Sequence, residues 1–201
     1  MGRPASGRPG SPPASPSTEF DFSFQKSVSR QVLAHLAQLD FLSEAGNVVF
    51  LGPPGTGKTH LSIADGIRAC LAGHRVAFAT ATEWVARLGD AHRQGRLEEE
   101  LRRLRRFPLV VVDEIGYIPF DPEAANLMFM LVSSRYERAS LVVTSNKPFS
   151  AWGEIFGDAV VAAAMVDRLV YHAEVLSLRG DSYRLKDRDM GRMVRPAAER
   201  V

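Results

Sequence analysis

The stretch VVFLGPPGTGKTHLS, residues 48–62, joins two regular patterns through a loop of glycines and prolines. Four apolar residues, 48–51, predict a strand, and a helical pattern starts at Lys58. The pattern G-x-x-x-x-G-K-[ST] between a strand and a helix is typical of a phosphate-binding loop, with an ordinary Gly-rich turn as the alternative. Glycines let backbone N–H groups approach phosphate oxygens, and the start of the helix adds unpaired donors and the positive end of its dipole.

The residues around this loop predict a nucleotide with its metal. In such loops the lysine reaches the β- and γ-phosphates and the threonine hydroxyl binds Mg²⁺, so we expect Lys58 to bind ATP and Thr59 to bind Mg²⁺. His60 follows the loop, but one histidine does not predict a metal site. The candidate nucleotide-binding residues of the loop are Gly52, Pro53, Pro54, Gly55, Thr56, Gly57, Lys58, Thr59 and His60.

Composition and charge limit the classes of protein to consider. The chain has 201 residues, 45% of them hydrophobic, which is enough for one medium domain with a sizeable core. A net charge of +2 gives no global field for nucleic acid, so any basic surface must be local. No apolar run approaches the roughly 18 residues that span a bilayer, and no apolar secretory region lies near the start.

The chain contains a single cysteine, Cys70. One cysteine excludes an internal disulfide and a multi-Cys zinc site, and it fits a reducing cytosol, so we expect a cytoplasmic protein. Cys70 shares an apolar helical face with Ile63 and Ile67, which predicts a place in the core.

From Asn47 onward, short apolar runs alternate with helical patterns. The runs NVVFLG, RVAFAT, LVVVDE, LVVTSN and AEVLSL predict strands. Strands of unalternated apolar residues are typically buried on both faces, so the alternation predicts an α/β fold with a parallel sheet sandwiched by helices. The helical patterns lie at about residues 58–72, 82–94, 96–106, 122–137 and 158–171.

The two ends of the chain differ from this central part. Residues 1–18 are almost all Gly, Pro, Ser, Ala and Arg and cannot bury enough apolar surface to offset ordering entropy, so we expect a disordered arm. The segment FDFSF, residues 20–24, is expected to dock on the domain edge, and residues 27–39 predict a helix. The folded core is therefore expected over residues 19–186, with a charged tail over residues 187–201.

The run LVVVDE, residues 109–114, ends in two acids. Ligands of open α/β sheets gather at the carboxyl ends of the strands. Asp113 is expected to hold Mg²⁺ through its waters, and Glu114 to orient and deprotonate the attacking water. Alone, two acids at a strand end more often begin a turn, but the phosphate loop upstream favours the functional interpretation.

The run LVVTSN, residues 141–146, predicts a further strand that ends in small polar residues. Asn146 is a candidate to place its amide between the γ-phosphate and the attacking water. By itself such an asparagine more often caps a strand end. Its position one strand after Asp113 favours the functional interpretation.

Residues 52–59, 113–114 and 144–146 resemble the Walker A, Walker B and sensor 1 motifs of AAA+ ATPases, which are P-loop NTPases. The stretches GPPGTGKTHL, DEIGYIPF, SSRYERASLVVTSNKPFSAWGEIFGDAVVAAAMVDRL and LRGDSYRL resemble the IstB family. Its members are ATP-binding transposition helpers of insertion sequences, related to helicase loaders of the DnaC and DnaI type. The resemblance covers about residues 19–186. It implies an AAA+ core that self-assembles on duplex DNA, with ATP at subunit interfaces, and that serves a partner transposase.

The resemblance also assigns two arginines. Arg168, in AAAMVDRLV, matches an arginine finger that touches ATP on the neighbouring subunit and offsets charge developing on the phosphates. Without the resemblance, a helix-surface arginine would be the favoured interpretation. Arg184, in GDSYRL, matches a sensor 2 arginine at the nucleotide.

Two departures from the family pattern stand out. The family normally carries a helical N-terminal domain, implicated in partner and DNA contacts, where this chain has residues 1–18. This departure favours a truncated copy and weighs against transposase recruitment. The given sequence also ends soon after GDSYRL, so we expect no full helical lid domain within it.

The roughly 30 residues between Thr80 and Leu109 are long for one crossover and predict two helices, as in the initiator and loader branch of AAA+ proteins. The segment GRLEEELRRLRRF contains arginines that can grip DNA phosphates regardless of sequence. A solvated helix is the alternative, with the i,i+4 pairs Glu98–Arg102 and Glu99–Arg103. The four arginines are Arg102, Arg103, Arg105 and Arg106.

The leading functional interpretation is a DNA-dependent ATPase that assists transposition. One alternative is a helicase-loader-like protein with the same core, which a DnaB-type helicase pull-down would distinguish. Another is a remnant that binds nucleotide or DNA without hydrolysis. The presence of Lys58, Asp113 and Glu114 together favours an active enzyme.

Overall fold

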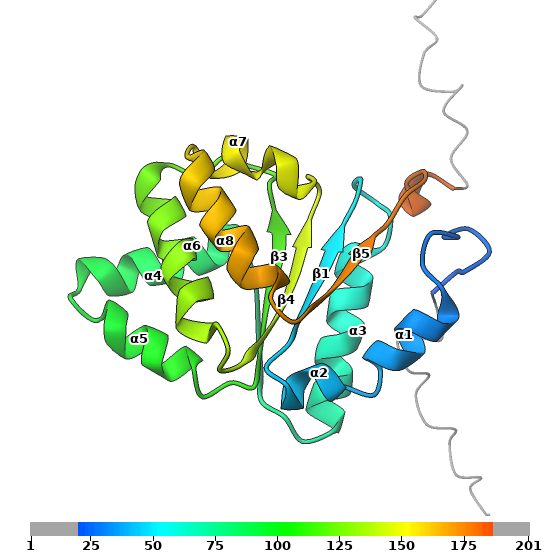
Figure 1. Ribbon diagram of the computed structural model, residues 1–201, viewed down its shortest axis with the longest axis horizontal. Helices are drawn as coiled ribbons and strands as arrows, with labels where there is room; N and C mark the ends of the chain where they lie inside the picture. Colours follow the sequence, from blue (N-terminus) through cyan, green and yellow to red (C-terminus); the bar gives the residue numbers. More distant parts are fainter. Residues whose placement is uncertain (1–19, 187–201) are drawn as a thin grey trace, which may run out of the picture.

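The computed structural model describes residues 20–186, so the predicted arm, residues 1–18, and the predicted tail, residues 187–201, lie outside the described residues. Its centre is a five-stranded parallel sheet with the strand order β2-β3-β4-β1-β5 (Figure 1). This confirms the predicted parallel sheet. The strands are β1 (Asn47–Leu51), β2 (Val76–Thr80), β3 (Leu109–Ile115), β4 (Ser140–Ser145) and β5 (Ala173–Ser177).

Helices cover both faces of this sheet (Figure 1). One face packs against α3, α1 and α2, and the other against α4, α6, α7 and α8, while α5 packs beside α4. The α-helices are α1 (Arg30–Leu36), α2 (Asp40–Ser43), α3 (Lys58–Leu71), α4 (Ala81–Arg93), α5 (Leu97–Leu104), α6 (Pro122–Arg135), α7 (Trp152–Phe156) and α8 (Ala159–Val170). Two 3-10 helices, η2 (Phe149–Ala151) and η3 (Tyr183–Leu185), complete the described elements.

The inner strands β1, β3 and β4 contribute to a core on each side of the sheet. In β3, Leu109 and Val111 join the core beneath α3, whereas Val110 and Val112 join the core beneath α4, α6 and α8. Alternate residues of a strand face opposite sides, which explains why these runs are apolar throughout. The outer strands β2 and β5 are less buried than the unalternated runs predicted, because each has a neighbouring strand on one side only.

Side chains at the ends of strands and loops cap the first turns of several helices. Thr80 and Glu83 form a reciprocal capping box at the start of α4. Asp121 accepts a backbone N–H of the first turn of α6, and Pro122 takes the first helical position, where its missing N–H costs no hydrogen bond. Asp158 caps α8 in the same way. These contacts fix the helices that follow the carboxyl edge of the sheet.

The predicted helices from residue 58 onward are confirmed, with ends that shift by one or two residues. The helix predicted over residues 27–39 is shorter. It ends near Leu36, because Leu39 adopts a left-handed backbone conformation (φ +64°) before α2 begins. None of the helices in residues 20–186 is long and apolar enough to cross a membrane.

The predicted core position of Cys70 is wrong. The cysteine is exposed, and the side chains of Ile63 and Ile67 on the same face of α3 are 40% and 39% exposed. Instead, α3 packs through Leu61 and Ala69 and through other small residues beside them. The helix therefore turns its bulkier isoleucines toward the surface.

Candidate nucleotide-binding site

The loop between β1 and α3 adopts backbone conformations that favour glycine. Gly52 has φ +146°, and a Cβ there would lie 2.2 Å from the carbonyl oxygen of Leu178. Gly57 precedes α3 with φ +100°, and a Cβ there would lie 2.8 Å from the ring of Phe20. Both positions therefore exclude larger residues. The predicted order of strand, loop and helix is present, as a phosphate-binding loop requires.

Lys58 lies in the first turn of α3 with its side chain buried against the loop. Its ammonium Nζ donates a hydrogen bond to the carbonyl oxygen of Pro53 at 2.8 Å. Burial lowers the pKa of Lys58, and the nearby carboxylate of Asp113 partly opposes that shift. The ammonium therefore lies within electrostatic range of the acid that ends β3.

Asp113 lies where β3, β4 and the start of α3 meet. The hydroxyl of Thr59 donates to Asp113 Oδ1 at 3.2 Å, and the hydroxyl of Thr144 in β4 donates to the same oxygen at 2.6 Å. Hydroxyl and carboxylate oxygens are ligands that Mg²⁺ prefers, so Thr59 and Asp113 fit the predicted metal role. Within residues 20–186 there is no cluster of three His, Cys, Asp or Glu side chains that could hold a metal. A Mg²⁺ ion here would therefore need phosphate or water oxygens as further ligands.

Glu114, near the end of β3, and Asn146, directly after β4, lie at the same edge of the sheet. Glu114 is exposed, with a left-handed backbone (φ +64°). The side-chain oxygen of Asn146 is buried without a hydrogen-bond partner among the described residues. A Cβ on Gly116 would lie 2.8 Å from that oxygen, so Asn146 abuts the loop that follows Glu114.

A pocket of about 460 Å³ opens beside the phosphate loop, a volume within the usual range for small-molecule sites. Residues 55–60, which include Lys58, Thr59 and His60, form one wall. The other walls are formed by Phe20, Asp21, Phe24, Gln25, Tyr117, Tyr183 and Arg184. Gly52, Pro53 and Pro54 shape the loop but do not line this pocket.

Segments from both ends of the described chain close over the phosphate loop. Gln25 Nε2 donates to the carbonyl oxygen of Thr56 at 3.2 Å. The backbone N–H of Tyr183 donates to the carbonyl oxygen of Gly55 at 2.9 Å. Lys186 Nζ and Asp21 Oδ2 join the two segments at 2.6 Å. The predicted docking of residues 20–24 therefore takes place at the phosphate loop.

The two arginines assigned by the resemblance lie in different surroundings. Arg184 lines the pocket, as predicted for a residue that binds nucleotide. Arg168 does not line it. Its Nη1 donates to the carbonyl oxygen of Ala164 at 2.8 Å, and its guanidinium lies 4.8 Å from the ring centroid of Phe129. Arg168 therefore belongs to the surface of α8 and α6 and is separate from the pocket of its own chain.

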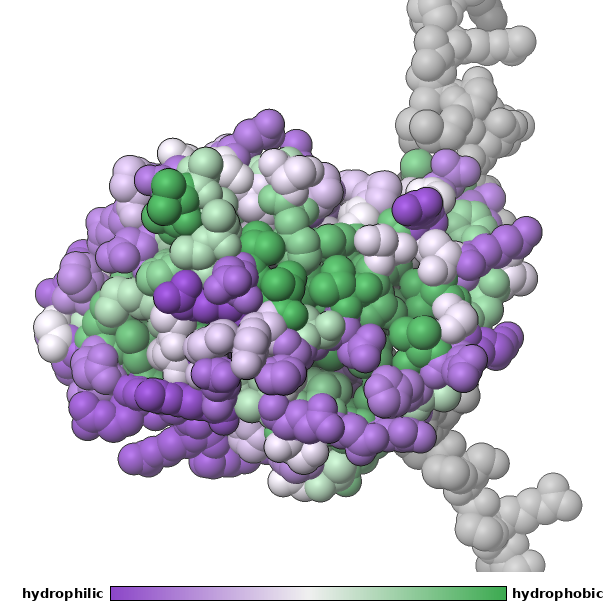
Figure 2. Space-filling model, viewed as in Figure 1, coloured by the Kyte–Doolittle hydropathy of each residue, from purple (hydrophilic) through white to green (hydrophobic). Residues whose placement is uncertain are grey.

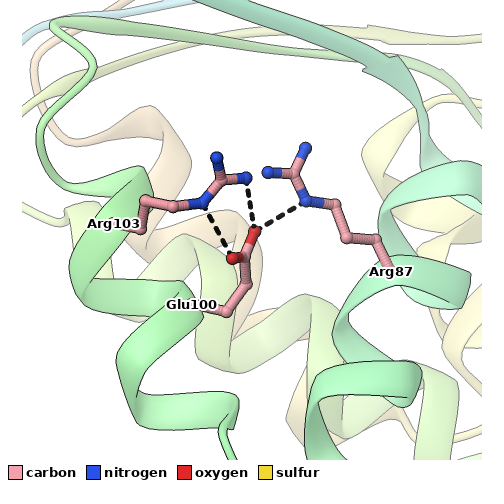
Figure 3. Close-up of polar contacts among 3 residues, drawn as sticks. All are labelled: Arg87, Glu100 and Arg103. Atoms are coloured by element: carbon pink, nitrogen blue, oxygen red, sulfur yellow. Dashed lines mark hydrogen bonds and ion pairs between the residues drawn. The ribbon is translucent and has the colours of Figure 1, made fainter.

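The predicted ion pairs of α5 are wrong. Glu100, on the side of α5 that faces α4, forms ion pairs with Arg87 at 2.6 Å and Arg103 at 2.9 Å (Figure 3). Glu98 pairs with Arg105 at 2.8 Å, seven residues away. Arg103 therefore pairs at the i,i+3 spacing in place of the predicted i,i+4 spacing, and α4 supplies Arg87 as a second partner of Glu100.

Arg102 and Arg106 remain as candidates for anion binding. Neither guanidinium forms an ion pair with any of residues 20–186, and both line a groove of about 580 Å³ between α4 and α5. Arg87, Arg96 and Arg103 line the same groove. Figure 2 shows hydrophilic residues gathered at the lower left, over α5.

A family model described as IstB-like ATP binding protein matches residues 12–191. The chain belongs to this family. An insertion sequence IS21 putative ATP-binding protein of Pseudomonas aeruginosa is 48% identical to this IstB-like chain over 170 residues, covering 85% of this chain and 64% of that protein. An insertion sequence IS5376 putative ATP-binding protein of Geobacillus stearothermophilus is 43% identical over 169 residues, which cover 84% of this chain and 67% of that protein. The chain thus spans about two thirds of the length of these relatives.

Solved structures with the same fold include replication proteins. AMPPCP-bound DnaA from Aquifex aeolicus has a TM-score of 0.67 at 16% identity and covers 88% of this IstB-like chain and 53% of that one. DnaI has a TM-score of 0.63 at 18% identity, and the match covers 75% of this chain and 85% of DnaI. The DnaC helicase loader has a TM-score of 0.61 at 20% identity, and the match covers 74% of this chain and 87% of DnaC. The fold is therefore that of AAA+ P-loop proteins.

Sequence motifs missed several residues that line the pocket of this IstB-like protein. Phe20, Gln25, Tyr117 and Tyr183 contact the phosphate loop or face it from outside the motifs. The aromatic alternation of residues 20–24 was the one available signal. It indicated docking, but no spacing rule linked those residues to the loop.

Proposed function

We propose that this IstB-like chain is a DNA-dependent AAA+ ATPase that assembles on duplex DNA and assists a transposase. The observation that carries the proposal is the meeting of Lys58, Thr59, Asp113 and Glu114 at one edge of the sheet beside a pocket. Family membership supports ATP as the ligand. The names of the relatives refer to insertion sequences, which supports transposition over helicase loading.

In the proposed reaction, water attacks the γ-phosphorus of ATP and ADP leaves with the bridging oxygen. Lys58 exchanges the carbonyl of Pro53 for the β- and γ-phosphates, and the first N–H groups of α3 donate to phosphate oxygens. Thr59 and Asp113 would hold Mg²⁺. A Mg²⁺ ion held there would supply positive charge against the phosphates.

Glu114 is the proposed general base for this reaction. Its carboxylate is exposed at the carboxyl edge of the sheet, so it can accept a proton from the attacking water. Asn146, at the end of the neighbouring strand, is the proposed group that orients this water. Its unpaired side-chain oxygen is consistent with a partner that arrives with the substrate.

Arg168 is proposed to act on the ATP of a neighbouring copy. Its guanidinium is partly exposed on α8 and does not line the pocket of its own chain, which supports a role at the site of another subunit. There it would offset charge developing on the phosphates. Arg184 supplies the corresponding cation within the chain.

For duplex DNA, we propose contacts through Arg102 and Arg106 of the α4–α5 region. Their side chains are without an acidic partner among residues 20–186, so phosphate contacts would not require breaking an ion pair. Arg103 and Arg105 are already paired with glutamates and are weaker candidates.

Phosphate release from ATP, with and without duplex DNA, tests this function. We expect hydrolysis that DNA stimulates in the parent chain and that is lost in Lys58→Ala, which removes the cation facing the phosphates. ATP binding without hydrolysis in the presence of DNA would instead indicate a nucleotide-binding remnant. Capture of a DnaB-type helicase, without a response to a transposase, would favour helicase loading.

A further inference from the structure

β3 contains one residue more than β4 where the two strands approach the site. Val112 pairs with Val143 and Ile115 pairs with Ser145, so three steps along β3 match two steps along β4. Such a bulge leaves the extra residue outside the ladder and bends the strand locally. The irregular residues are Asp113 and Glu114, the acidic pair itself.

The bulge decides which side of the sheet each acid faces. Val110, Val112 and Ile115 all belong to the core beneath α4, α6 and α8, although Ile115 breaks the two-residue alternation. In a regular strand, Glu114 would occupy that buried face, because alternate residues share a face. The bulge gives the buried position to Ile115 and leaves Glu114 exposed at the edge. Asp113 stays on the α3 side, where the Thr59 hydroxyl reaches it.

A single hydroxyl contacts both acidic residues at this bulge. Thr144 Oγ1 donates to Asp113 Oδ1 at 2.6 Å and accepts the backbone N–H of Glu114 at 2.9 Å. Thr144 is 1% exposed and Asp113 is 2% exposed, so water does not replace these bonds easily. The Glu114 backbone, at φ +64°, has a conformation that residues other than glycine adopt only when their surroundings hold it.

No neighbouring side chain at the end of β4 duplicates these two bonds. The hydroxyl of Ser145 accepts the backbone N–H of Lys147 and donates to its carbonyl oxygen, both at 3.1 Å. The buried side-chain oxygen of Asn146 has no hydrogen-bond partner among the described residues. Thr144 is therefore the residue of β4 through which the irregular part of β3 is held.

We propose that Thr144 is a positioning residue for ATP hydrolysis, whose hydroxyl holds the β3 bulge so that Asp113 faces Thr59 and Glu114 stays exposed at the carboxyl edge of the sheet. The inference rests on the proposed ATPase function. Thr144 acts through the two acids and does not itself touch ATP. Its removal should therefore affect Mg²⁺ binding and turnover while leaving metal-free nucleotide binding in place.

Thr144→Val and Thr144→Ser test this proposal. Valine keeps the branched shape of threonine without the hydroxyl, and serine keeps the hydroxyl without the methyl group. Metal-free ATP affinity should stay within about twofold of the parent in both variants. In the valine variant, the Mg²⁺ concentration for half-saturation should rise about tenfold or more, and single-turnover hydrolysis should fall by about 10- to 100-fold, because hydrogen bonds to charged groups are strong. The serine variant should stay within about threefold of the parent in both measurements.

Ser140→Ala is the matched control. Ser140 begins the same strand, is fully buried and donates its hydroxyl to the carbonyl oxygen of Phe41 at 3.0 Å, far along β4 from Asp113. Its loss should lower the unfolding temperature without changing the Mg²⁺ titration. Unfolding temperatures of all three variants, measured together, separate lost stability from lost positioning.

Two results would overturn the role of Thr144. One is a parental Mg²⁺ titration in a folded Thr144→Val chain, and the other is an equal loss in the valine and serine variants. Failure of the proposed function looks different, since the parent chain itself would then bind ATP with Mg²⁺ and not hydrolyse it. In that case the Mg²⁺ titration alone still decides whether Thr144 positions Asp113.

Discussion

Glu114 differs from Asp113 in how its carboxylate is held. The Asp113 carboxylate accepts hydrogen bonds from two hydroxyls, whereas no residue in the described range 20–186 hydrogen-bonds the carboxylate of Glu114. Its backbone is fixed and its side chain is left available to a water molecule. This difference separates a metal-holding acid from a proton-accepting one.

We expect Glu114→Gln to bind ATP and Mg²⁺ as the parent does and to lose turnover. The amide preserves the shape and cannot accept the proton, and loss of a general base typically slows a reaction by roughly 10²- to 10⁴-fold. Single-turnover hydrolysis, measured beside nucleotide affinity, checks this. Glu123→Gln, a matched change in the first turn of α6, should hydrolyse at the parental rate. Normal hydrolysis by Glu114→Gln would assign the base elsewhere.

At the scale of elements, α3 joins the phosphate loop to a buried acid. Asp65, two turns after Lys58, is 8% exposed, and its Oδ2 has no hydrogen-bond partner among residues 20–186. Burial raises the pKa of Asp65 from 3.8 to about 7, although the charge of Arg68 opposes the shift. Because the folded state holds this proton more tightly than the unfolded state, stability from Asp65 is full below about pH 4 and is lost as pH rises toward 7.

Asp65→Asn should therefore become more stable relative to the parent as pH rises. The amide stays neutral, so the difference in unfolding temperature, variant minus parent, should increase from pH 5 to pH 8. Thermal unfolding across this range measures it. Asp40→Asn, at an exposed aspartate of α2, is the control for effects of charge on the whole chain. A difference that does not change with pH would show that Asp65 is ionised throughout.

The groove between α4 and α5 leads to a prediction about DNA binding. Replacing Arg102 and Arg106 together by alanine should weaken duplex binding and reduce the slope of log affinity against log salt by about 2, because two phosphate contacts are lost. Arg138 and Arg179 are exposed arginines outside this groove, so their replacement by alanine is a control that removes the same charge. Titrations of duplex DNA at several salt concentrations compare the two double variants. Equal salt slopes in both double variants would exclude the groove as the DNA site.

The elements also show how far sequence patterns reach. Lys58, Thr59, Asp113 and Glu114 were predictable because each belongs to a short contiguous motif whose strand-and-helix context fixes its place. The ion pair of Glu100 with Arg87 was not, because Arg87 comes from a different helix. The role of Thr144 was not predictable either, since it depends on one extra residue in the register between β3 and β4. A pattern within one segment therefore predicts a motif residue, whereas a contact between two segments depends on how they pack or pair in the fold.

For the whole molecule, the pocket and Arg168 form two different surfaces of the same chain. If one copy presents its pocket to the Arg168 of the next, the contact joins unlike surfaces. Repetition of such a contact generates a ring or a helical filament. We therefore expect that ATP hydrolysis depends on assembly, and that one site requires residues from two chains.

Mixing Lys58→Ala with Arg168→Ala chains tests whether two chains share one ATP site. Each variant alone should hydrolyse little ATP, because every interface lacks either the loop cation or the cation from the neighbour. In an equal mixture assembled on duplex DNA, some interfaces pair an intact Lys58 with an intact Arg168. Activity should therefore partly return, measured as phosphate release beside light scattering that confirms assembly. An assembled mixture that stays as inactive as either variant alone would contradict the shared site.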